Sequence, residues 1–210
     1  MEMARTKQKM HFETLVEVCC QNFDGVWFGV ACDKKEIVST SFSESEEKTL
    51  SSLLATLPFD VPFQVSFKPS AFAESVLDSL KKIFDGEEPD STFPFAYAPL
   101  PTYTQKVLKA TMQIPIGYVS SYGSIAKAVG GGARAVGNIM ASNPFAPIVP
   151  CHRVVKSDFT LGGYGGGLKT KIELLNREKK GFSDSMQVHV KDGFLTVFPT
   201  EYVLRNLDFL

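Results

Sequence analysis

A proline-rich stretch divides this chain of 210 residues into two parts. Residues 86–101 read GEEPDSTFPFAYAPLP, with four prolines among sixteen residues. Proline has no backbone N–H and a fixed φ, so this stretch is excluded from the interior of a helix or a central strand. We therefore predict a linker at 86–101 between a first domain, 11–85, and a second domain, 102–181. The apolar fraction of 44% is typical of a folded chain, and the length allows two small domains.

Apolar and β-branched runs broken by turn signals characterise the first domain. They predict a meander of antiparallel strands at 15–19, 26–32 and 37–42. Ser70 is the expected N-cap of a helix whose apolar residues form one stripe and which ends at Asp85-Gly86. Residues 1–10 are expected to be a flexible, basic leader.

Two short helices around a glycine run are the main feature of the second domain. Ser121 opens a helix that ends at the glycine run 130–132, and a second helix of small residues is expected over 133–141. This outline is that of a helix-turn-helix.

Two further helices are expected in the second domain. The first runs over 102–112 and begins with a Thr102–Gln105 capping box, and the second runs over 168–178. After them, 187–190 and 194–198 alternate around Lys191-Asp192-Gly193, which predicts a β-hairpin within a tail at 182–210. The predicted fold class is thus α+β: a small antiparallel sheet with helices, then a mostly helical domain, then a hairpin-like tail.

The charge balance excludes a strong positive electrostatic field over the whole protein. Lys and Arg number 22 against 23 Asp and Glu, for a net charge of −1, so any contact with nucleic acid must come from a local basic patch or helix ends. No apolar run is long enough to span a bilayer, and the first ten residues lack the apolar core of a secretory signal. We expect no membrane partner and an intracellular location, nuclear in a eukaryote and cytoplasmic otherwise.

Cys151 stands apart from the other cysteines and is followed directly by His152. Thiols attack as thiolates, and a neighbouring imidazole can take the proton. Neighbours in a strand point in opposite directions, so the two side chains meet only if the backbone bends, which Pro144 and Pro150 favour. The alternative is a buried structural cysteine beside a surface histidine.

Several segments together resemble the O6-alkylguanine-DNA alkyltransferases, or methylated-DNA–protein-cysteine methyltransferases. The resemblance extends over about 103–181, PCHRVV is its most specific element, and the first domain matches only in outline. It is carried by Tyr122, 130–141, Asn143-Pro144, 150–155 and 163–167. It implies a ribonuclease-H-like first domain, and a helix-turn-helix that docks in the minor groove while the target base is flipped out.

The resemblance also implies the reaction. An alkyl group, chiefly methyl, moves once from O6 of guanine, or from O4 of thymine, to Cys151. His152 relays the thiol proton through a water, Glu178 orients His152, and Tyr122 donates its proton to N3 of the departing guanine. Without the resemblance, Glu178 would be expected to be a solvated surface residue, and Tyr122 would be expected to pack at the start of a helix.

The remaining site residues are assigned in the same way. Arg134 occupies the gap in the DNA base stack that the flipped base has left, although exposed arginines more often form surface ion pairs. Close approach to DNA is expected at Ser121, Ala133, Ala135 and Gly137. The base pocket is expected to involve Met140, Val154, Tyr164 and Gly165, and the residues with a structural role in the site are Asn143, Pro150 and Arg153. Some relatives carry serine where this chain has Gly165, so only a backbone amide can contact the base there.

The expected partner is double-stranded DNA carrying O6-alkylguanine, bound by a monomer that needs no cofactor and no metal. Zinc held by His11, Cys19, Cys20 and Cys32 is an alternative, but no C-x-x-C pair is present and core cysteines are favoured. Two other functions remain open: a Cys-His thiol hydrolase, which has no use for Arg134, and a lesion sensor without repair activity, which would lack Cys151.

Overall fold

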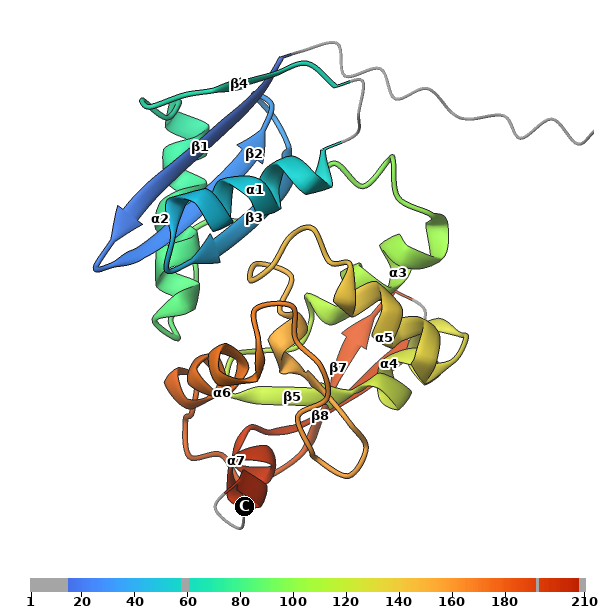
Figure 1. Ribbon diagram of the computed structural model, residues 1–210. Helices are drawn as coiled ribbons and strands as arrows, with labels where there is room; N and C mark the ends of the chain where they lie inside the picture. Colours follow the sequence, from blue (N-terminus) through green and yellow to red (C-terminus); the bar gives the residue numbers. More distant parts are fainter. Residues whose placement is uncertain (1–14, 58–60, 192, 208–210) are drawn as a thin grey trace, which may run out of the picture.

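The computed structural model describes residues 15–57, 61–191 and 193–207, so the expected leader and His11 lie outside the described residues. The two predicted parts are each built around a sheet, with the first half above the second in Figure 1. Among the described residues, no helix is both long and apolar enough to cross a membrane.

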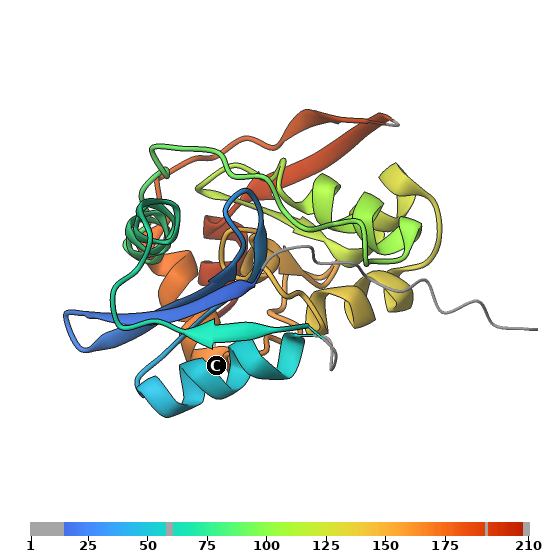
Figure 2. The same ribbon diagram turned by 90° about the horizontal axis from the view of Figure 1, so that it is seen from above.

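The first half is a sheet with a helix on each face. Strands β1, β2 and β3 form the predicted antiparallel meander at Val16–Phe23, Val26–Cys32 and Ile37–Ser43. Helices α1 (Glu46–Thr56) and α2 (Ala71–Phe84) lie on opposite sides of it (Figure 2). Leu53 of α1 packs with Val18, whereas Leu77 of α2 packs with Val30. Because both faces are covered, β2 is an almost continuous apolar run.

Two elements of the first half differ from the prediction. Helix α1, capped by Ser45, was not expected, and neither was strand β4 (Phe63–Val65). Strand β4 pairs parallel with β1 in the order β3-β2-β1-β4, so the sheet is mixed rather than purely antiparallel. The α+β class is confirmed.

The helix-turn-helix is present as predicted. Strand β5 (Tyr118–Ser121) leads into α4 (Tyr122–Val129), and α5 (Ala133–Ala141) follows the glycine turn. Gly130 and Gly131 have φ of 82° and 103°, a region that favours glycine. These backbone angles explain why the turn contains glycines.

The prediction of a capping box at the start of the second half is wrong. Helix α3 (Thr102–Thr111) has Pro101 at its N-cap and no side-chain cap, and Gln105 Nε2 donates instead to the Leu100 carbonyl. The last predicted helix is present as α6 (Leu168–Arg177).

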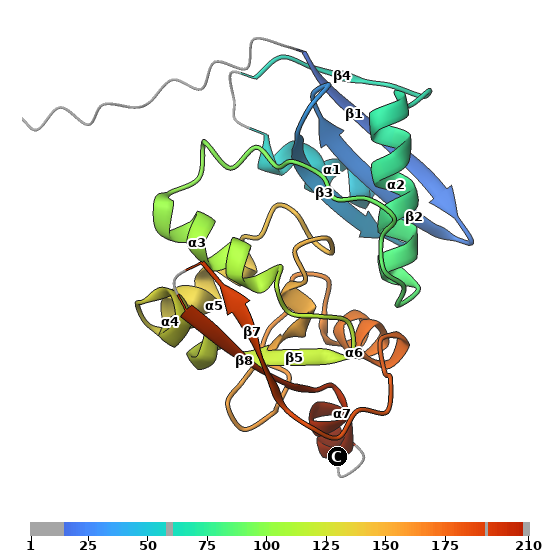
Figure 3. The ribbon, with the colours of Figure 1, turned by 180° about the vertical axis from the view of Figure 1, so that it is seen from behind.

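The predicted hairpin is confirmed as β7 (Met186–Val190) paired antiparallel with β8 (Gly193–Pro199), and α7 (Glu201–Leu207) follows it. The hairpin is part of a sheet, because β8 also pairs with β5, which pairs in turn with β6 (Val154–Val155). Figure 3 shows the β7–β8 hairpin running across β5. The second half therefore contains a sheet in the order β6-β5-β8-β7 and is less helical than expected.

The predicted linker packs against the first half. Its carbonyl at Pro94 accepts from the Ile37 amide, and its Ala96 amide donates to the Ile37 carbonyl, at 2.9 Å each. Phe95 is buried in an apolar cluster that continues from α2 into the second half. The two halves are thus joined by a common core.

Integration of the hairpin can be tested at two adjacent residues that face opposite ways. Leu195 is fully buried, whereas Phe194 is 63% exposed. We expect Leu195→Ala to lower the free energy of unfolding by about 2–4 kcal/mol, and Phe194→Ala by less than about 1 kcal/mol. Urea unfolding measures both. Equal, small effects would mean that the hairpin is an independent appendage.

Candidate active site

Cys151 lies in a bend of the backbone, as its flanking prolines suggested. Pro150 has φ −80° and ψ 66°, and Cys151–Arg153 forms one turn of 3-10 helix before β6. The turn is buried, with Cys151 only 6% exposed. A strand would point Cys151 and His152 to opposite sides, and the turn removes that restriction.

His152 and Arg153 both contact the carboxylate of Glu178, which is fully buried at the end of α6. His152 Nε2 lies 2.8 Å from Oε1, and Arg153 donates through Nη2 to Oε1 at 2.8 Å and through Nε to Oε2 at 2.9 Å. Arg153 Nη1 also donates to the carbonyl of Ile114. The bidentate arginine holds the carboxylate in one orientation, and the carboxylate holds the imidazole.

The protonation states follow from these contacts. His152 and Arg153 outweigh the effect of burial and lower the pKa of Glu178 to about 2. Burial lowers the pKa of His152 despite the attraction of Glu178, so the imidazole is neutral near pH 7. A carboxylate only accepts, so the His152 proton is on Nε2 and Nδ1 keeps its lone pair. Nδ1 is buried and has no hydrogen-bond partner among the described residues, so it is available as a base.

Cys151 is a neutral thiol at rest. Burial raises its pKa, while the Asn143 side chain and the charge of Lys171 act in the opposite direction. The net direction is upward, so nucleophilic attack requires a base at the moment of reaction.

Asn143 shapes the segment that leads to Cys151. Its Nδ2 donates to the Val149 carbonyl at 2.9 Å, and its Oδ1 accepts from the Phe145 amide at 3.0 Å. The side chain therefore joins the end of α5 to the residues just before the thiol, which is the structural position expected for it.

Lys171 is a buried charge that the sequence analysis missed. Its ammonium group is fully buried and donates to the carbonyls of Val154 and Leu161, at 2.6 Å each, and of Gly163 at 3.3 Å. Burial lowers its pKa to about 8, against the attraction of Cys151. The sequence signal that could have identified Lys171 as buried is its position on the apolar stripe of the helix, three residues after Leu168 and four before Leu175.

Tyr122 begins α4 and lies against the loop that Lys171 holds. Its hydroxyl donates to the Gly163 carbonyl at 3.5 Å, and a Cβ on Gly162 would come within 2.8 Å of that hydroxyl. Burial, and secondarily Cys151, raise its pKa, so it keeps its proton. Ser121 differs from the expectation, because it is buried and its hydroxyl caps α4 by accepting from the Ser124 amide.

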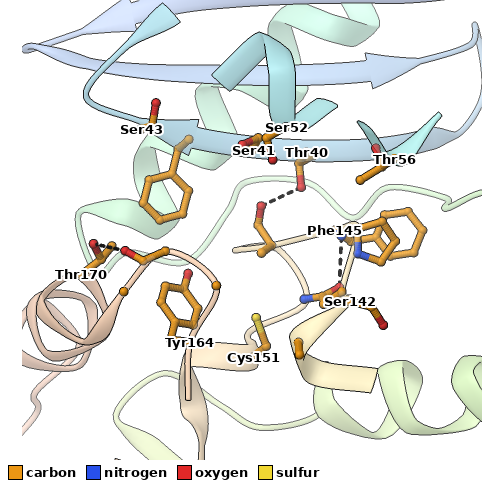
Figure 4. A pocket seen from close by; sticks show the side chains of 18 of the residues that line it. Thr40, Ser41, Ser43, Ser52, Thr56, Ser142, Phe145, Cys151, Tyr164 and Thr170 are labelled. Atoms are coloured by element: carbon orange, nitrogen blue, oxygen red, sulfur yellow. Dashed lines mark hydrogen bonds between the residues drawn. The ribbon is translucent and has the colours of Figure 1, made fainter. Parts of the chain in front are cut away.

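A cleft of about 1130 Å³ lies between the two halves, and Cys151 is among the residues that line it. Met140, Tyr164 and Gly165 also line it, and Figure 4 shows Cys151 and Tyr164 below a row of hydroxyl side chains from the first half. Val154 differs from the expectation, because it is fully buried outside the lining and contributes its carbonyl to Lys171.

Arg134 lies on the exposed side of α5. Ala133 and Ala135 beside it are also exposed, and Gly137 is partly buried next to Tyr122. The N-terminus of α5 at Gly132 has no side-chain cap, so its first amides are available to an external acceptor.

Cys19, Cys20 and Cys32 are free thiols, with Cys19 and Cys32 in the core. Among the described residues, no three His, Cys, Asp or Glu side chains are grouped as metal ligands. His11, the fourth residue of the zinc alternative, lies outside the described part.

Comparisons with known proteins agree with this site. Residues 102–180 match the family model "6-O-methylguanine DNA methyltransferase, DNA binding domain". A methylated-DNA–protein-cysteine methyltransferase of Mycobacterium leprae is 43% identical over 122 residues, which are 56% of this chain and 73% of the relative. A Methanothermobacter thermautotrophicus relative with the same name is 35% identical over 52% of this chain and 63% of its own length.

Solved structures are similar over more of the chain. The O6-methylguanine-DNA methyltransferase of Pyrococcus kodakaraensis has a TM-score of 0.62 at 27% identity, covering 78% of this chain and 99% of that one. Mycobacterium tuberculosis OGT in complex with DNA has a TM-score of 0.60 at 28% identity, covering 78% of this chain and 93% of that one.

The fold and site define a two-part α+β protein with a helix-turn-helix beside a buried cysteine, histidine and glutamate. The chain belongs to the family of methylated-DNA–protein-cysteine methyltransferases. The resemblance inferred from PCHRVV and its surrounding segments is thereby confirmed.

The buried carboxylate predicts a pH-dependent stability. The pKa of Glu178 falls from 4.5 in the unfolded chain to about 2, so its contribution is present above pH 4.5 and is lost as pH falls toward 2. We expect Glu178→Gln to cost on the order of 3 kcal/mol near pH 7, and the difference from wild type to shrink between those two pH values.

The control is Glu173→Gln on the same helix, because Glu173 pairs with Arg177 near the surface and should cost less than about 1 kcal/mol. Urea unfolding across the pH range measures both variants. A Glu178→Gln cost as small as the control would contradict the buried network.

Proposed function

We propose that this protein repairs DNA by direct reversal, transferring a methyl or other alkyl group from O6 of guanine to Cys151 in a single turnover. The observation that carries the proposal is the neutral His152 whose Nδ1 is a free buried base next to the thiol in sequence, with Glu178 on its other nitrogen. The family model and the curated relatives bear the same activity in their names.

The residues support each step of the transfer. His152 Nδ1 takes the proton of Cys151, directly or through a water, and Glu178 stabilises the imidazolium that results. The sulfur forms a bond to the alkyl carbon as the bond from that carbon to O6 breaks, and the electron pair goes to the guanine. Tyr122, still protonated, donates to N3 of the leaving base.

The product explains why no cofactor is required and why each molecule acts once. The acceptor is the protein's own sulfur, and a thioether does not hydrolyse back to a thiol. O4 of thymine presents the same alkyl–oxygen bond and is the second substrate that we propose.

The proposed partner is double-stranded DNA, bound by a monomer through α5. Small residues at Ala133, Ala135 and Gly137 let the helix approach the minor groove, and Arg134 occupies the place of the flipped base. The protein would act where DNA is kept, in the nucleus of a eukaryote or the cytoplasm otherwise.

The reaction can be read from the mass of the intact protein. Mixing with duplex DNA that carries O6-methylguanine should add one methyl group, on Cys151, and Cys151→Ala should add none while keeping its DNA affinity. Cys20→Ala is the matched control and should be methylated normally. A hydrolase or a sensor would show no mass change, and methylation of Cys151→Ala would exclude Cys151 as acceptor.

Base flipping predicts that Arg134 matters only for duplex substrates. We expect Arg134→Ala to slow single-turnover repair of duplex DNA roughly tenfold or more, and to leave the reaction with free O6-benzylguanine nearly unchanged. Arg205→Ala, which removes an exposed charge on α7, controls for charge. An equal loss of rate on both substrates would mean that Arg134 does not act in base flipping.

A further inference from the structure

The segment before the reactive cysteine, residues 143–150, has little regular structure of its own. Three of its eight residues are prolines, at 144, 147 and 150, and these have no N–H to donate. Within it the Phe145 carbonyl accepts from the Val149 amide, whereas other carbonyls need donors from outside the segment. We call this segment the cysteine loop.

Thr40 of β3 supplies two of these donors. Its amide donates to the Pro144 carbonyl at 2.8 Å, and its Oγ1 donates to the Ala146 carbonyl at 2.8 Å. Figure 4 shows Thr40 on the strand above the loop, with Cys151 below it. Thr40 is 6% exposed, so both bonds are largely shielded from water.

Aromatic packing holds the same part of the loop. Phe145 is 1% exposed, with its ring centroid 4.8 Å from that of Phe95 and 5.5 Å from that of Tyr97. Both partners belong to the segment that follows the first half, and Phe95 is bridged to β3 at Ile37. Thr40 and these rings thus hold the loop from outside, while Asn143 braces it from within through Val149 and Phe145.

We propose that Thr40 is a positioning residue for alkyl transfer, which holds the cysteine loop so that the Cys151 sulfur meets the substrate and His152. This rests on the proposed function, but Thr40 lies outside residues 102–180 that match the family model. The hydroxyl acts through Ala146 and the loop, across 106 residues of sequence. A shift of the loop would also move Asn143, which lowers the pKa of the thiol.

The test compares Thr40→Val with Thr40→Ser and with Thr49→Val. Thr40→Val keeps the branched shape and the amide bond but loses the hydroxyl donor, whereas Thr40→Ser keeps both donors. Thr49 is a matched control because it is buried in the first half and its Oγ1 donates to the Trp27 carbonyl at 3.3 Å, away from the loop.

Single-turnover methyl transfer from O6-methylguanine DNA at saturating protein is the first readout. We expect a rate about fivefold lower for Thr40→Val, with unchanged DNA affinity, and near-normal rates for Thr40→Ser and Thr49→Val. Melting temperatures should fall by similar amounts in the two valine variants. Equal rates for Thr40→Val and wild type, or an equal loss in Thr49→Val, would overturn the proposal.

Alkylation of Cys151 by iodoacetamide against pH, followed on its peptide by mass, is the second readout. We expect the midpoint pH of alkylation to be higher for Thr40→Val than for wild type, and Thr40→Ser to have the wild-type midpoint. A substitution that affected stability alone would leave the midpoint of Thr40→Val unchanged, and this result would overturn the proposal. This measurement needs no DNA. Failure of the proposed function would instead appear as absence of methyl transfer in the wild-type protein.

Discussion

The buried carboxylate of Glu178 is the charge on which the active site depends. A lone carboxylate without water would be too costly, so the fold surrounds it with Arg153 and His152. Because Arg153 neutralises the Glu178 carboxylate, the His152 imidazole can remain neutral. The carboxylate accepts from His152 and so fixes its proton on Nε2. The same ion pair therefore stabilises the fold and leaves Nδ1 as a base. Stability and chemistry share one set of contacts.

Buried charges also fix the backbone around the site. Lys171 joins three carbonyls from β6 and the loop after it, and Arg153 reaches back to Ile114 before β5. Each cation thus connects segments that are distant in sequence. In a low-dielectric interior an unpaired donor or acceptor is costly, so these connections define one arrangement of the loop against Tyr122. Among these site residues His152 Nδ1 is the buried polar atom left without a partner, and it is the atom proposed to act as the base.

Local signals in the sequence were sufficient for some of this structure. A glycine run between a short helix and a helix of small residues predicted the helix-turn-helix, and the resemblance around PCHRVV implied that Glu178 orients His152. Features set by distant partners were missed: β8 pairs with β5 about 80 residues away, and Thr40 reaches Ala146 across 106 residues. Lys171 was missed because a lysine on an apolar stripe is buried only when carbonyls from other segments meet it.

The four cysteines show how the fold distinguishes one thiol. Burial, with a smaller contribution from nearby carboxylates, raises the pKa of Cys19 and Cys32 to about 12 and of Cys20 to about 11. Burial raises the pKa of Cys151 too, but Asn143 and Lys171 oppose it. A protonated sulfur is a poor nucleophile toward stray electrophiles. Since the proposed reaction consumes its sulfur, a Cys151 thiol that stays protonated at rest is protected from such side reactions before a lesion is bound.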